Sequence, residues 1–434
     1  MFDHYRTNLS RRPRTLTWRG ATVVVAILLS LAGCGAATPT AAPSAPAPAP
    51  AAQASTSAPA AIESPAPTAT DPWLDAELVQ PSAVTSAPTL APGFQCHPCH
   101  FLEEEQLFGV GAAPGGLIAV GVEQPPAQAI AFFSSDGQHW VALTGFTGIA
   151  GTTAIAAASN GRRSVIVGLD PTGATAWVSA GGGPWSQAPK QSDLLVPYAA
   201  GAMTSVAAFG SGFVAGGYRD DPLHVKASAA VWRSDDGLTW HLDGGAGIFA
   251  GGRIWGIAAK AGTIVAVGTN GDPIYGPAAI WRWTQADGWQ RGRIGPDDSG
   301  AIRAVAVTPT GFVAVGLNGK DTGARTWTSS DGLDWTAAPD QPAFLYYGLP
   351  VRMQSVVAGP FGLVAGGWRS DAGKGSSVTW TSTNGVNWQG PFWEASFSGG
   401  QITGVAASAG GVVAVGRTGY PDWNQAWIWL NPAP

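Results

Sequence analysis

Six arginines recur at related positions in the second half of the chain, and their chemistry is that of anion recognition. Each lies near one end of a short apolar segment that is repeated along the sequence: Arg219, Arg253, Arg303, Arg352, Arg369 and Arg417. The planar guanidinium group presents paired N–H donors that match a carboxylate or another anion in bidentate geometry. Local ion pairs are the competing interpretation, because four aspartates lie close by in the sequence. These are Asp220, Asp221, Asp371 and Asp422.

Aromatic residues accompany the arginines in the same stretches. They are Tyr218, Tyr275, Trp368, Tyr420 and Trp423 on one side of the apolar segments, and Phe344, Tyr346, Tyr347, Phe392 and Trp393 on the other. Aromatic rings beside charged donors suit recognition of a glycan, a peptide or a protein partner. Packing of each ring beneath its own loop is the alternative. We count Tyr218, Trp368 and Tyr420 with the six arginines as candidate ligand-binding residues.

A second group with chemical potential is the segment Cys96-His97-Pro98-Cys99-His100. Its C-x-x-C-H pattern is typical of c-type haem attachment, in which two thioethers hold the porphyrin and the histidine ligates the iron. The flanking segment is short for enclosing a porphyrin, however. A disulfide between Cys96 and Cys99 is the simpler interpretation in an oxidising compartment, and metal binding by the same residues is a further alternative.

A regular repeat positions these candidates. An apolar run that closes on glycine, most often as apolar-apolar-Ala-x-Gly, occurs seven times with 47 to 51 residues between successive copies. The runs end at Gly121, Gly168, Gly217, Gly268, Gly316, Gly367 and Gly416. A period of about 40 to 50 residues built from four short strands is typical of a β-propeller blade, because one small sheet cannot bury both faces alone. We therefore predict an all-β, seven-bladed β-propeller of four-stranded antiparallel blades over residues 107–434.

The segment before each apolar run is the predicted innermost strand. Eleven residues before the glycine stands a valine or isoleucine, preceded by glycine, alanine or serine, in six copies. In the second copy we place Ala154 and Ile155 at these two positions by allowing two extra residues in the turn at 160–163. Small residues suit strands that crowd a common axis. The first strand begins, and the second ends, on the face where ligands usually bind to propellers, which is also where the arginines gather.

Tryptophan recurs at two further positions of the repeat. The predicted third strands carry Phe132, Trp177, Trp232, Trp281, Trp327, Trp380 and Trp427, and the predicted fourth strands open with Trp140, Trp185, Trp240, Trp289, Trp335 and Trp388. A buried aromatic side chain removes roughly 150 to 250 Å² from water. We interpret these residues as packing between blades and not as a platform for sugars.

A turn motif joins the third strand to the fourth. Three copies have the form S-x-D-G-x-x-W and a fourth has asparagine in place of aspartate; their residues are Ser134, Asp136, Gly137, Trp140, Ser234, Asp236, Gly237, Trp240, Ser329, Asp331, Gly332, Trp335, Ser382, Asn384, Gly385 and Trp388. The aspartate can accept backbone N–H bonds within its own turn, and glycine can adopt a positive φ. The motif resembles the Asp-box, or BNR repeat, of sialidase-like propellers. That resemblance implies a structural role on the outside of the ring.

By this resemblance, residues 107–430 are similar to exported Asp-box propellers, a group that includes sialidases and photosystem II assembly-factor propellers. Sialidases combine an arginine triad, a tyrosine–glutamate pair and an acid aspartate on six blades. Arg253, Arg303, Arg352, Tyr346 or Tyr347, and Glu394 are the residues that could take such roles. No stretch matches the family's first-blade arginine motif, and seven repeats are present. We therefore expect no catalytic residues, with a glycoside hydrolase as one alternative and a haem-bearing redox protein as another.

The N-terminal region has the features of an export signal and a tether. Residues 1–33 combine five arginines with an apolar run that is too short for a membrane span, which needs about 20 residues. Leu31-Ala32-Gly33-Cys34 resembles the bacterial lipobox, which implies cleavage before Cys34 and its lipidation. Residues 34–72 are almost only Ala, Pro, Ser and Thr, a composition typical of a disordered linker. We expect a membrane-anchored protein on the extracytoplasmic side.

Charge and chain ends complete the expectations. Removal of residues 1–33 takes away five arginines and one aspartate, so 18 basic and 27 acidic residues remain, with a formal net charge of −9. This balance argues against nucleic-acid binding, which needs clustered cations. The last repeat lacks a fourth strand, and residues 73–106 are expected to close the ring, with Trp73–Leu78 as that strand and the Cys96–Cys99 segment as an insertion. We expect a monomer with no resident cofactor or metal.

Overall fold

The computed structural model describes residues 77–79, 105–124, 126–143, 146, 150–196, 200–221, 226–244, 246–295, 300–346, 349–359, 362–371, 374–392, 400–408, 411–418 and 426–432. Within these ranges the chain forms 29 strands, one four-residue helix and one short 3-10 helix. No helix of the described residues has the length and apolar character that a membrane span requires. Cys34, Cys96, Cys99, His100 and Tyr420 lie outside the described residues.

The strands form seven antiparallel sheets, or blades, in chain order. Blade 1 contains β2 (Glu105–Ala113), β3 (Gly116–Glu123), β4 (Gln128–Ser134) and β5 (Val141–Ala142). Blade 2 contains β6 (Thr153–Ser159), β7 (Arg163–Asp170), β8 (Gly173–Ala180) and β9 (Trp185–Gln187). Blade 3 contains β10 (Gly201–Phe209), β11 (Gly212–Asp221), β12 (Lys226–Ser234) and β13 (His241–Asp243), and helix α1 (Ala246–Phe249) follows it. Blade 4 contains β14 (Gly252–Lys260), β15 (Thr263–Asn270), β16 (Ala278–Thr284) and β17 (Gly288–Arg291).

The remaining three blades complete the fold. Blade 5 contains β19 (Ala301–Thr308), β20 (Gly311–Leu317), β21 (Ala324–Ser329) and β22 (Asp334–Ala337), and the short 3-10 helix η1 (Pro342–Phe344) follows. A fifth strand, β18 (Arg293–Ile294), pairs in parallel with β22 on its outer edge. Blade 6 contains β23 (Val351–Gly359), β24 (Gly362–Asp371), β25 (Lys374–Ser382) and β26 (Gln389–Phe392). Blade 7 contains β27 (Gly400–Ser408), β28 (Gly411–Thr418), β29 (Ala426–Pro432) and β1 (Glu77–Val79).

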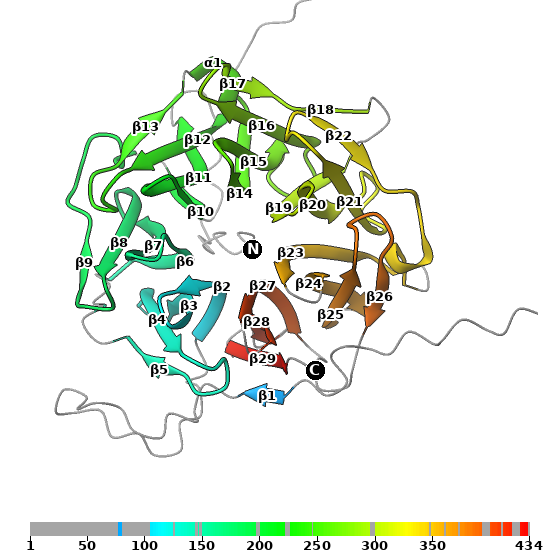
Figure 1. The fold of residues 1–434 in the computed structure, drawn as a ribbon, viewed down its shortest axis with the longest axis horizontal. Helices are drawn as coiled ribbons and strands as arrows, with labels where there is room; N and C mark the ends of the chain where they lie inside the picture. The colour runs from blue at the N-terminus through cyan, green and yellow to red at the C-terminus, as the bar shows by residue number, and fades with distance from the viewer. Residues whose placement is uncertain are drawn as a thin grey trace, which may run out of the picture. The chain divides into compact units, whose positions relative to one another are not determined.

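The blades close into a ring around a central axis. The first strands of successive blades lie next to one another at the centre, and β27 of blade 7 contacts β2 of blade 1 (Figure 1). The fold is therefore the predicted seven-bladed propeller of four-stranded antiparallel sheets, with β18 as an addition to blade 5. The fourth strand of blade 7 comes from the other end of the repeat region: β1 pairs antiparallel with β29, with Leu78 opposite Trp429. Residues 73–76 of the proposed closing segment lie outside the described residues.

Every innermost strand has a β-bulge at the same position, and it corrects one sequence assignment. In blade 2 the register shift falls between Ala154 and Ala156, so Ile155 is the bulged residue. Ala157 pairs with Ile166, just as Val110 pairs with Ala119 in blade 1. We predicted that Ala154 and Ile155 occupy the pair of positions that recurs in the other repeats, and that the next turn has two extra residues. This prediction was wrong.

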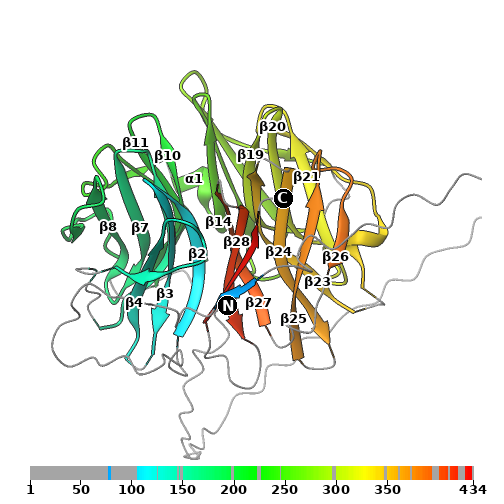
Figure 2. The same cartoon turned by 60° about the horizontal axis from the view of Figure 1, so that its bottom comes forward.

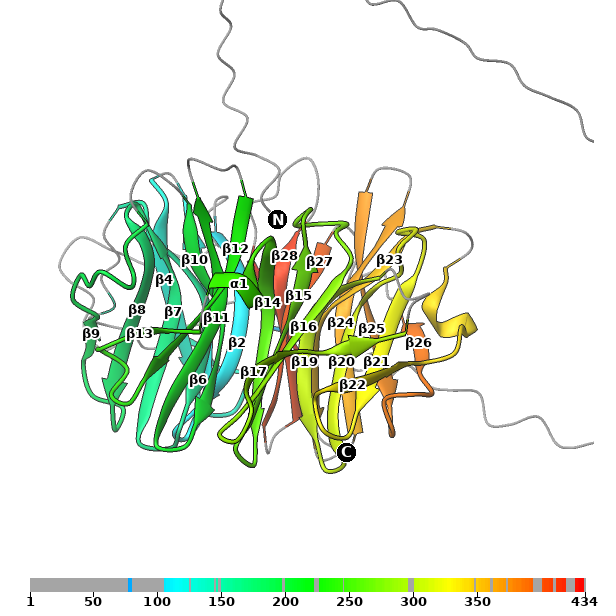
Figure 3. The ribbon, with the colours of Figure 1, turned by 90° about the horizontal axis from the view of Figure 1, so that it is seen from above.

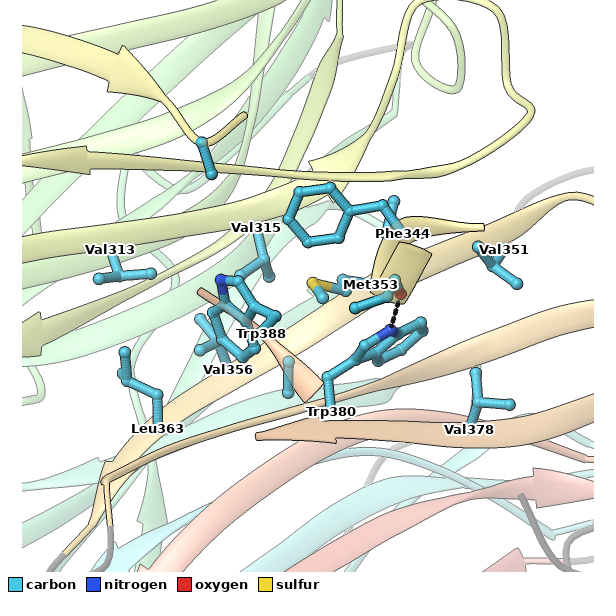
Figure 4. Packing of buried hydrophobic residues seen from close by; sticks show 14 of the residues in the cluster. Val313, Val315, Phe344, Val351, Met353, Val356, Leu363, Val378, Trp380 and Trp388 are labelled. Carbon is cyan, nitrogen blue, oxygen red and sulfur yellow. Dashed lines mark hydrogen bonds between the residues drawn. The ribbon is translucent and has the colours of Figure 1, made fainter. Parts of the chain in front are cut away.

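The hydrophobic core lies between blades. The described residues form seven buried clusters, and each contains residues of two adjacent blades. Figure 4 shows the cluster between blades 5 and 6, where Trp380 and Trp388 pack against Val315 and Phe344. Of the repeated third-strand aromatics, Trp177, Trp232, Trp281, Trp327 and Trp380 are at most 1% exposed. Each blade therefore depends on its neighbours to cover both of its faces.

Three third-strand tryptophans also attach the loop that enters their blade. The indole N–H of Trp232 donates to Asp193 O at 2.8 Å. In the same way, Trp281 donates to Ile248 O at 2.9 Å, and Trp380 donates to Ala343 O at 2.7 Å. The last of these bonds is the dashed line in Figure 4. A buried N–H without a partner is costly, so the tryptophan and the loop carbonyl stabilise each other. These bonds fix the loops that lead toward the ligand-binding face proposed from the sequence.

The S-x-D-G-x-x-W turns share one hydrogen-bond pattern. In the turn of blade 3, Asp236 Oδ1 accepts from the backbone N–H groups of Leu238 and Thr239 at 2.8 and 2.7 Å, and Ser234 Oγ accepts from Gly237 N at 2.8 Å. Trp240 Nε1 donates to Gly237 O at 3.0 Å. The glycine has φ 81°, which a side chain would disfavour. The same bonds recur in the turn of blade 6 with Asn384 as acceptor.

These turns also pack against the preceding blade. A Cβ atom on Gly237 would lie 2.8 Å from side-chain carbons of both Val165 and Val178 in blade 2. Two glutamines clamp the turns from the same side: Gln191 and Gln341 each donate to a turn carbonyl and accept from the N–H of the closing tryptophan. Sequence reasoning missed them, although each ends a short A-P-x-Q segment. The turns lie at the end of the blades opposite the start of the first strand, as the strand order requires (Figure 3).

We expect the turn aspartate to act as a hydrogen-bond acceptor and not as a charge. Asp236→Ala leaves two backbone N–H groups without their acceptor and should lower the free energy of unfolding by about 1 to 2 kcal/mol. Asp236→Asn should retain most of that stability, because Asn384 fills the same position in blade 6 with the same two bonds. Equilibrium unfolding in guanidinium chloride measures both. Equal losses in the two variants would contradict the acceptor role.

Candidate functional site

The six candidate arginines lie at one end of their blades, the end where first strands begin and second strands finish. We call this end the mouth face; Figure 2 shows the strands of neighbouring blades standing side by side around it. Arg253 and Arg352 are the second residues of β14 and β23, and Arg303 is the bulged residue of β19. Arg219, Arg369 and Arg417 lie near the ends of β11, β24 and β28. The expected common placement is thus seen in the structure.

Arg253 forms a local ion pair with the preceding blade. Its Nη2 donates to both carboxylate oxygens of Asp220, at 2.9 and 3.0 Å, and its Cζ lies 4.2 Å from the ring centroid of Tyr218. Tyr218 is 4% exposed. Burial raises the pKa of Asp220 even though Arg253 acts in the opposite direction. The arginine thus joins blades 3 and 4 through a local ion pair, which was the alternative interpretation for Arg253. The ring of Tyr218 is buried beside Arg253 and Trp255 of blade 4.

Arg303 is engaged by the loop between β15 and β16. Its Nη1 donates to Pro273 O at 3.1 Å and its Nη2 to Ile274 O at 2.6 Å. Its Cζ lies 5.7 Å from the ring of Trp255. Trp255 is the bulged residue of β14, and sequence reasoning missed it. Burial, and after it the charge of Arg352, lower the pKa of Arg303 to about 10. The guanidinium therefore stays charged at neutral pH, with neutral carbonyls as its hydrogen-bond partners.

Arg352 connects two loops of neighbouring blades to strand β23. Its Nε donates to Asp321 Oδ1 at 2.6 Å, its Nη2 bonds the other oxygen of Asp321, and the same Nη2 donates to the Tyr275 hydroxyl at 3.2 Å. Its Cζ also lies 4.8 Å from the ring of Trp368. Bonding to Asp321 raises the pKa of Arg352 against the opposing effect of burial. Asp321 was not among the aspartates that we expected to pair with the arginines.

The backbone of Asp321 is held in an unusual conformation. Its φ is 53°, in the left-handed region that side-chain-bearing residues rarely adopt. Asn318 organises the loop: its carbonyl accepts from Asp321 N at 3.0 Å, and its side-chain oxygen accepts from Lys320 N and Thr322 N. Such strain persists where the surrounding structure imposes it, and it is concentrated at functional sites. Here it directs the carboxylate to Arg352.

The loop between β15 and β16 presents Tyr275 to solvent. Asp272 Oδ1 accepts from Ile274 N and Tyr275 N, both at 2.7 Å, and so fixes a tight turn. Two backbone carbonyls of this loop accept from Arg303 and the Tyr275 hydroxyl accepts from Arg352, so blades 5 and 6 hold a loop of blade 4. Tyr275 is nevertheless 55% exposed. The sequence pointed to this aromatic but could not distinguish it from the buried ones.

The other three arginines are also engaged. Arg219 Nη2 donates to Leu195 O at 2.8 Å, and Arg369, 3% exposed, lies with its Cζ 4.1 Å from the ring of Tyr346. Arg417 Nη1 donates to Gln106 Oε1 at 2.7 Å. With its amide oxygen facing Arg417, Gln401 accepts from Nε and Nη2 at 2.7 and 2.8 Å. Burial lowers the pKa of Arg417 to about 10. Arg417 thus links blade 7 to blade 1.

The described mouth residues therefore form a continuous belt across blades 3 to 6. We define the arginine–aromatic belt as Tyr218, Arg253, Trp255, Tyr275, Arg303, Arg352 and Trp368. In this belt each arginine Cζ lies between 4.2 and 5.7 Å from the centroid of a neighbouring aromatic ring. Each belt arginine also has a hydrogen-bond acceptor within the protein. The belt can hold loops and rings rigidly, which is the requirement for a preorganised recognition surface.

The residues that a sialidase mechanism would need are only partly brought together. Arg253, Arg303 and Arg352 come from consecutive blades, but their N–H groups bond to Asp220, to two carbonyls and to Asp321. Tyr346 lies against Arg369, which is not one of these three arginines. Tyr347 and Glu394 lie outside the described residues. Each of these three guanidinium groups therefore directs part of its five N–H donors to acceptors within the protein, which leaves fewer of them for a substrate carboxylate.

A carboxylate pair lies at the mouth end of blade 1. Glu105 of β2 is opposite Glu123 of β3, and the buried Glu105 Oε2 makes no hydrogen bond to the described residues. Burial, and after it the charge of Glu123, raise the pKa of Glu105 to about 7. The Glu105 carboxyl thus binds its proton more tightly in the folded protein than in the unfolded chain. The stability that comes from this tighter proton binding is present below the unfolded pKa of Glu105 and is lost as the pH rises toward 7.

Glu105→Gln should therefore stabilise the protein at high pH only. At pH 8 we expect the free energy of unfolding to exceed that of the wild type by on the order of 2 kcal/mol, because the buried charge is gone. At pH 4.5 both side chains are neutral and the difference should vanish. Denaturant unfolding at the two pH values gives the comparison. A variant that is equally stabilised at both values would show that packing, and not ionisation, is responsible.

Comparisons with known proteins show the fold and not a family. No protein-family model matches the chain, and no curated protein matches it. Among solved structures, "YCF48 bound to D1 peptide" is similar with 14% identity and a TM-score of 0.50, over 76% of this chain and 94% of that chain. The WD40 propeller domain of Doa1 is similar with 13% identity and a TM-score of 0.46, over 75% and 92%. An acylaminoacyl peptidase of Pyrococcus horikoshii has 10% identity and a TM-score of 0.46, over 76% and 52%. At such identities, the comparison places this chain among β-propellers.

Proposed function

We propose that this chain is a lipid-anchored, non-catalytic binding propeller on the extracytoplasmic side of a membrane, which recognises a glycan, peptide or protein partner with its mouth face. The observation that carries the proposal is the arginine–aromatic belt, which fixes two loops of blades 4 and 5 around the exposed ring of Tyr275. Rigid loops with an exposed aromatic suit binding, because little conformational entropy is lost on association.

Engagement of the belt arginines supports a binding role over a catalytic one. A catalytic arginine must have donors available for the substrate or the developing charge. The donors of Arg253, Arg303 and Arg352 named above are directed to protein acceptors. One similar propeller is described as bound to a peptide, which is a precedent for binding by this fold. Fold alone does not decide function, so the argument depends on the belt.

The proposed anchoring rests on the N-terminal sequence. Leu31-Ala32-Gly33-Cys34 provides the lipobox-like site, and the Ala/Pro/Ser/Thr segment that follows separates it from the propeller. In a polyproline-like state, at about 3 Å per residue, this segment would span on the order of 100 Å. A binding domain on such a tether can reach partners beyond the membrane surface.

The binding proposal is tested with the Cys34→Ser protein, applied to a glycan array and to a displayed peptide library. Saturable binding that is weakened by changes at the mouth face supports it. Binding that is unaffected by mouth variants, or turnover of a fluorogenic sialoside, contradicts it. The matched control is Leu242→Ser. Leu242 is an exposed apolar residue on β13, the outermost strand of blade 3.

Cys34→Ser should also release the protein from membranes. Without the thiol, no thioether-linked lipid can form, and the mature chain has no other anchor in this proposal. We expect the wild type in the membrane fraction, labelled by a clickable palmitate analogue, and the variant unlabelled and outside that fraction. Ser30→Ala, four residues earlier, is the control and should behave like the wild type. Unchanged labelling of Cys34→Ser would contradict lipidation at this residue.

A further inference from the structure

Large apolar side chains are rarely exposed in the described part of the molecule, and two of them lie together at the mouth. Tyr275 is 55% exposed and Leu345 is 52% exposed. Tyr275 lies in the loop between β15 and β16, and Leu345 directly follows η1 in the loop that enters blade 6. Exposed apolar residues that cluster on one surface mark interaction sites, whereas scattered ones do not.

The two side chains contact one small assembly. Arg352 donates to the Tyr275 hydroxyl and to Asp321. Asp321 belongs to the loop 318–323, and Leu345 packs against the end of that loop: a Cβ atom on Gly323 would lie 3.1 Å from Leu345 Cδ2. We define Tyr275, Leu345 and the loop 318–323 as the mouth anchor patch.

Tyr275 is held in a fixed position although it is exposed. Its N–H is bound by Asp272, two carbonyls beside it are bound by Arg303, and its hydroxyl is bound by Arg352. The hydroxyl is thus used within the protein, and the ring is what remains available to a partner. A rigid tyrosine of this kind supplies contact area at low entropic cost, as do binding hot spots. The arginines act here as positioning residues.

The charge around the mouth anchor patch is positive. Lys320 is exposed, and no ion pair of Lys320 with a described residue is found. Arg303 has only neutral carbonyls as hydrogen-bond partners, whereas Arg352 is paired with Asp321. The Asp272 carboxylate is oriented toward the two backbone N–H groups of its turn. Charge complementarity therefore favours a partner with a carboxylate close to its apolar contact.

We propose that the mouth anchor patch binds a protein segment that carries an aliphatic or aromatic side chain next to an acidic residue. The apolar side chain contacts Tyr275 and Leu345, and the carboxylate faces Lys320. This inference rests on the proposed binding function and names its partner class. A protein segment fits better than a sugar because the patch includes the exposed aliphatic side chain of Leu345, whereas sugar-binding surfaces pair aromatic faces with open hydrogen-bond donors and acceptors.

The test uses a displayed library of random twelve-residue peptides on the Cys34→Ser protein, followed by titration of a synthetic selected peptide. We expect selected peptides to share an apolar residue beside Asp or Glu. In titrations, Tyr275→Ala should weaken binding by roughly 30-fold, as truncation of a hot-spot residue does. Leu345→Ser should weaken it by roughly tenfold. Tyr275→Phe retains the ring and should stay within about threefold, and the control Leu242→Ser should bind like the wild type.

The outcomes separate this inference from the proposed function. Selected peptides that bind equally to Tyr275→Ala but lose affinity in other mouth variants would overturn the anchor patch and leave the mouth-binding function intact. Glycan binding that depends on Tyr275, without any selected peptide, would show a sugar as the occupant and overturn the partner class. Failure of both libraries to yield a ligand would overturn both proposals. Each variant should show a single cooperative unfolding transition in denaturant, which verifies that it is folded. The midpoint should be slightly lower for the two Tyr275 variants, because both lose the hydroxyl that accepts from Arg352.

Discussion

Burial between neighbouring blades is the interaction on which the rest of this structure depends. A four-stranded blade has two faces, and the seven buried clusters of the described residues each combine two adjacent blades. An unclosed set would leave one apolar face exposed at each end. Closure of the ring is therefore required to bury the core. Two contacts provide it: β1 pairs with β29, and Thr403 Oγ1 of blade 7 donates to Leu107 O of blade 1 at 2.8 Å.

The same constraint places the mouth loops. The bulge in each first strand turns one side chain out of the regular ladder, and in blade 3 this residue, Thr204, donates to Ile254 O of the next blade. In blade 5 the corresponding residue is Arg303, which reaches the loop of blade 4 instead. A position that joins blades in one repeat thus organises a loop of the mouth face in another. The regular ring supplies rigid positions, and the residue type at each position decides which neighbour it bonds.

Much of the fold could be predicted from the sequence, because the periodic features are imposed by closure. The seven glycine-terminated runs and the repeated tryptophans fix blade number and strand order. The register of blade 2 was misread because Ile155 looked like the apolar residue of the pattern, and only strand pairing reveals that it is bulged. At the site, the positions of the arginines were predictable, whereas their partners were not. Asp321, which pairs with Arg352, has a positive φ that the residue types of its loop did not indicate.

The difference between a free and an engaged arginine decides how the mouth face should be understood. A guanidinium whose donors are directed to carbonyls or to Asp321 has fewer of its five N–H donors left for an external anion. Charge at this surface therefore acts first within the protein, by fixing the loop of Tyr275 and the strained loop of Asp321. What the loops then present outward is an aromatic ring, an aliphatic side chain and Lys320. In the proposed function, specificity depends on how rigidly these groups are held, so the partly buried ion pairs would contribute to recognition without contacting the partner.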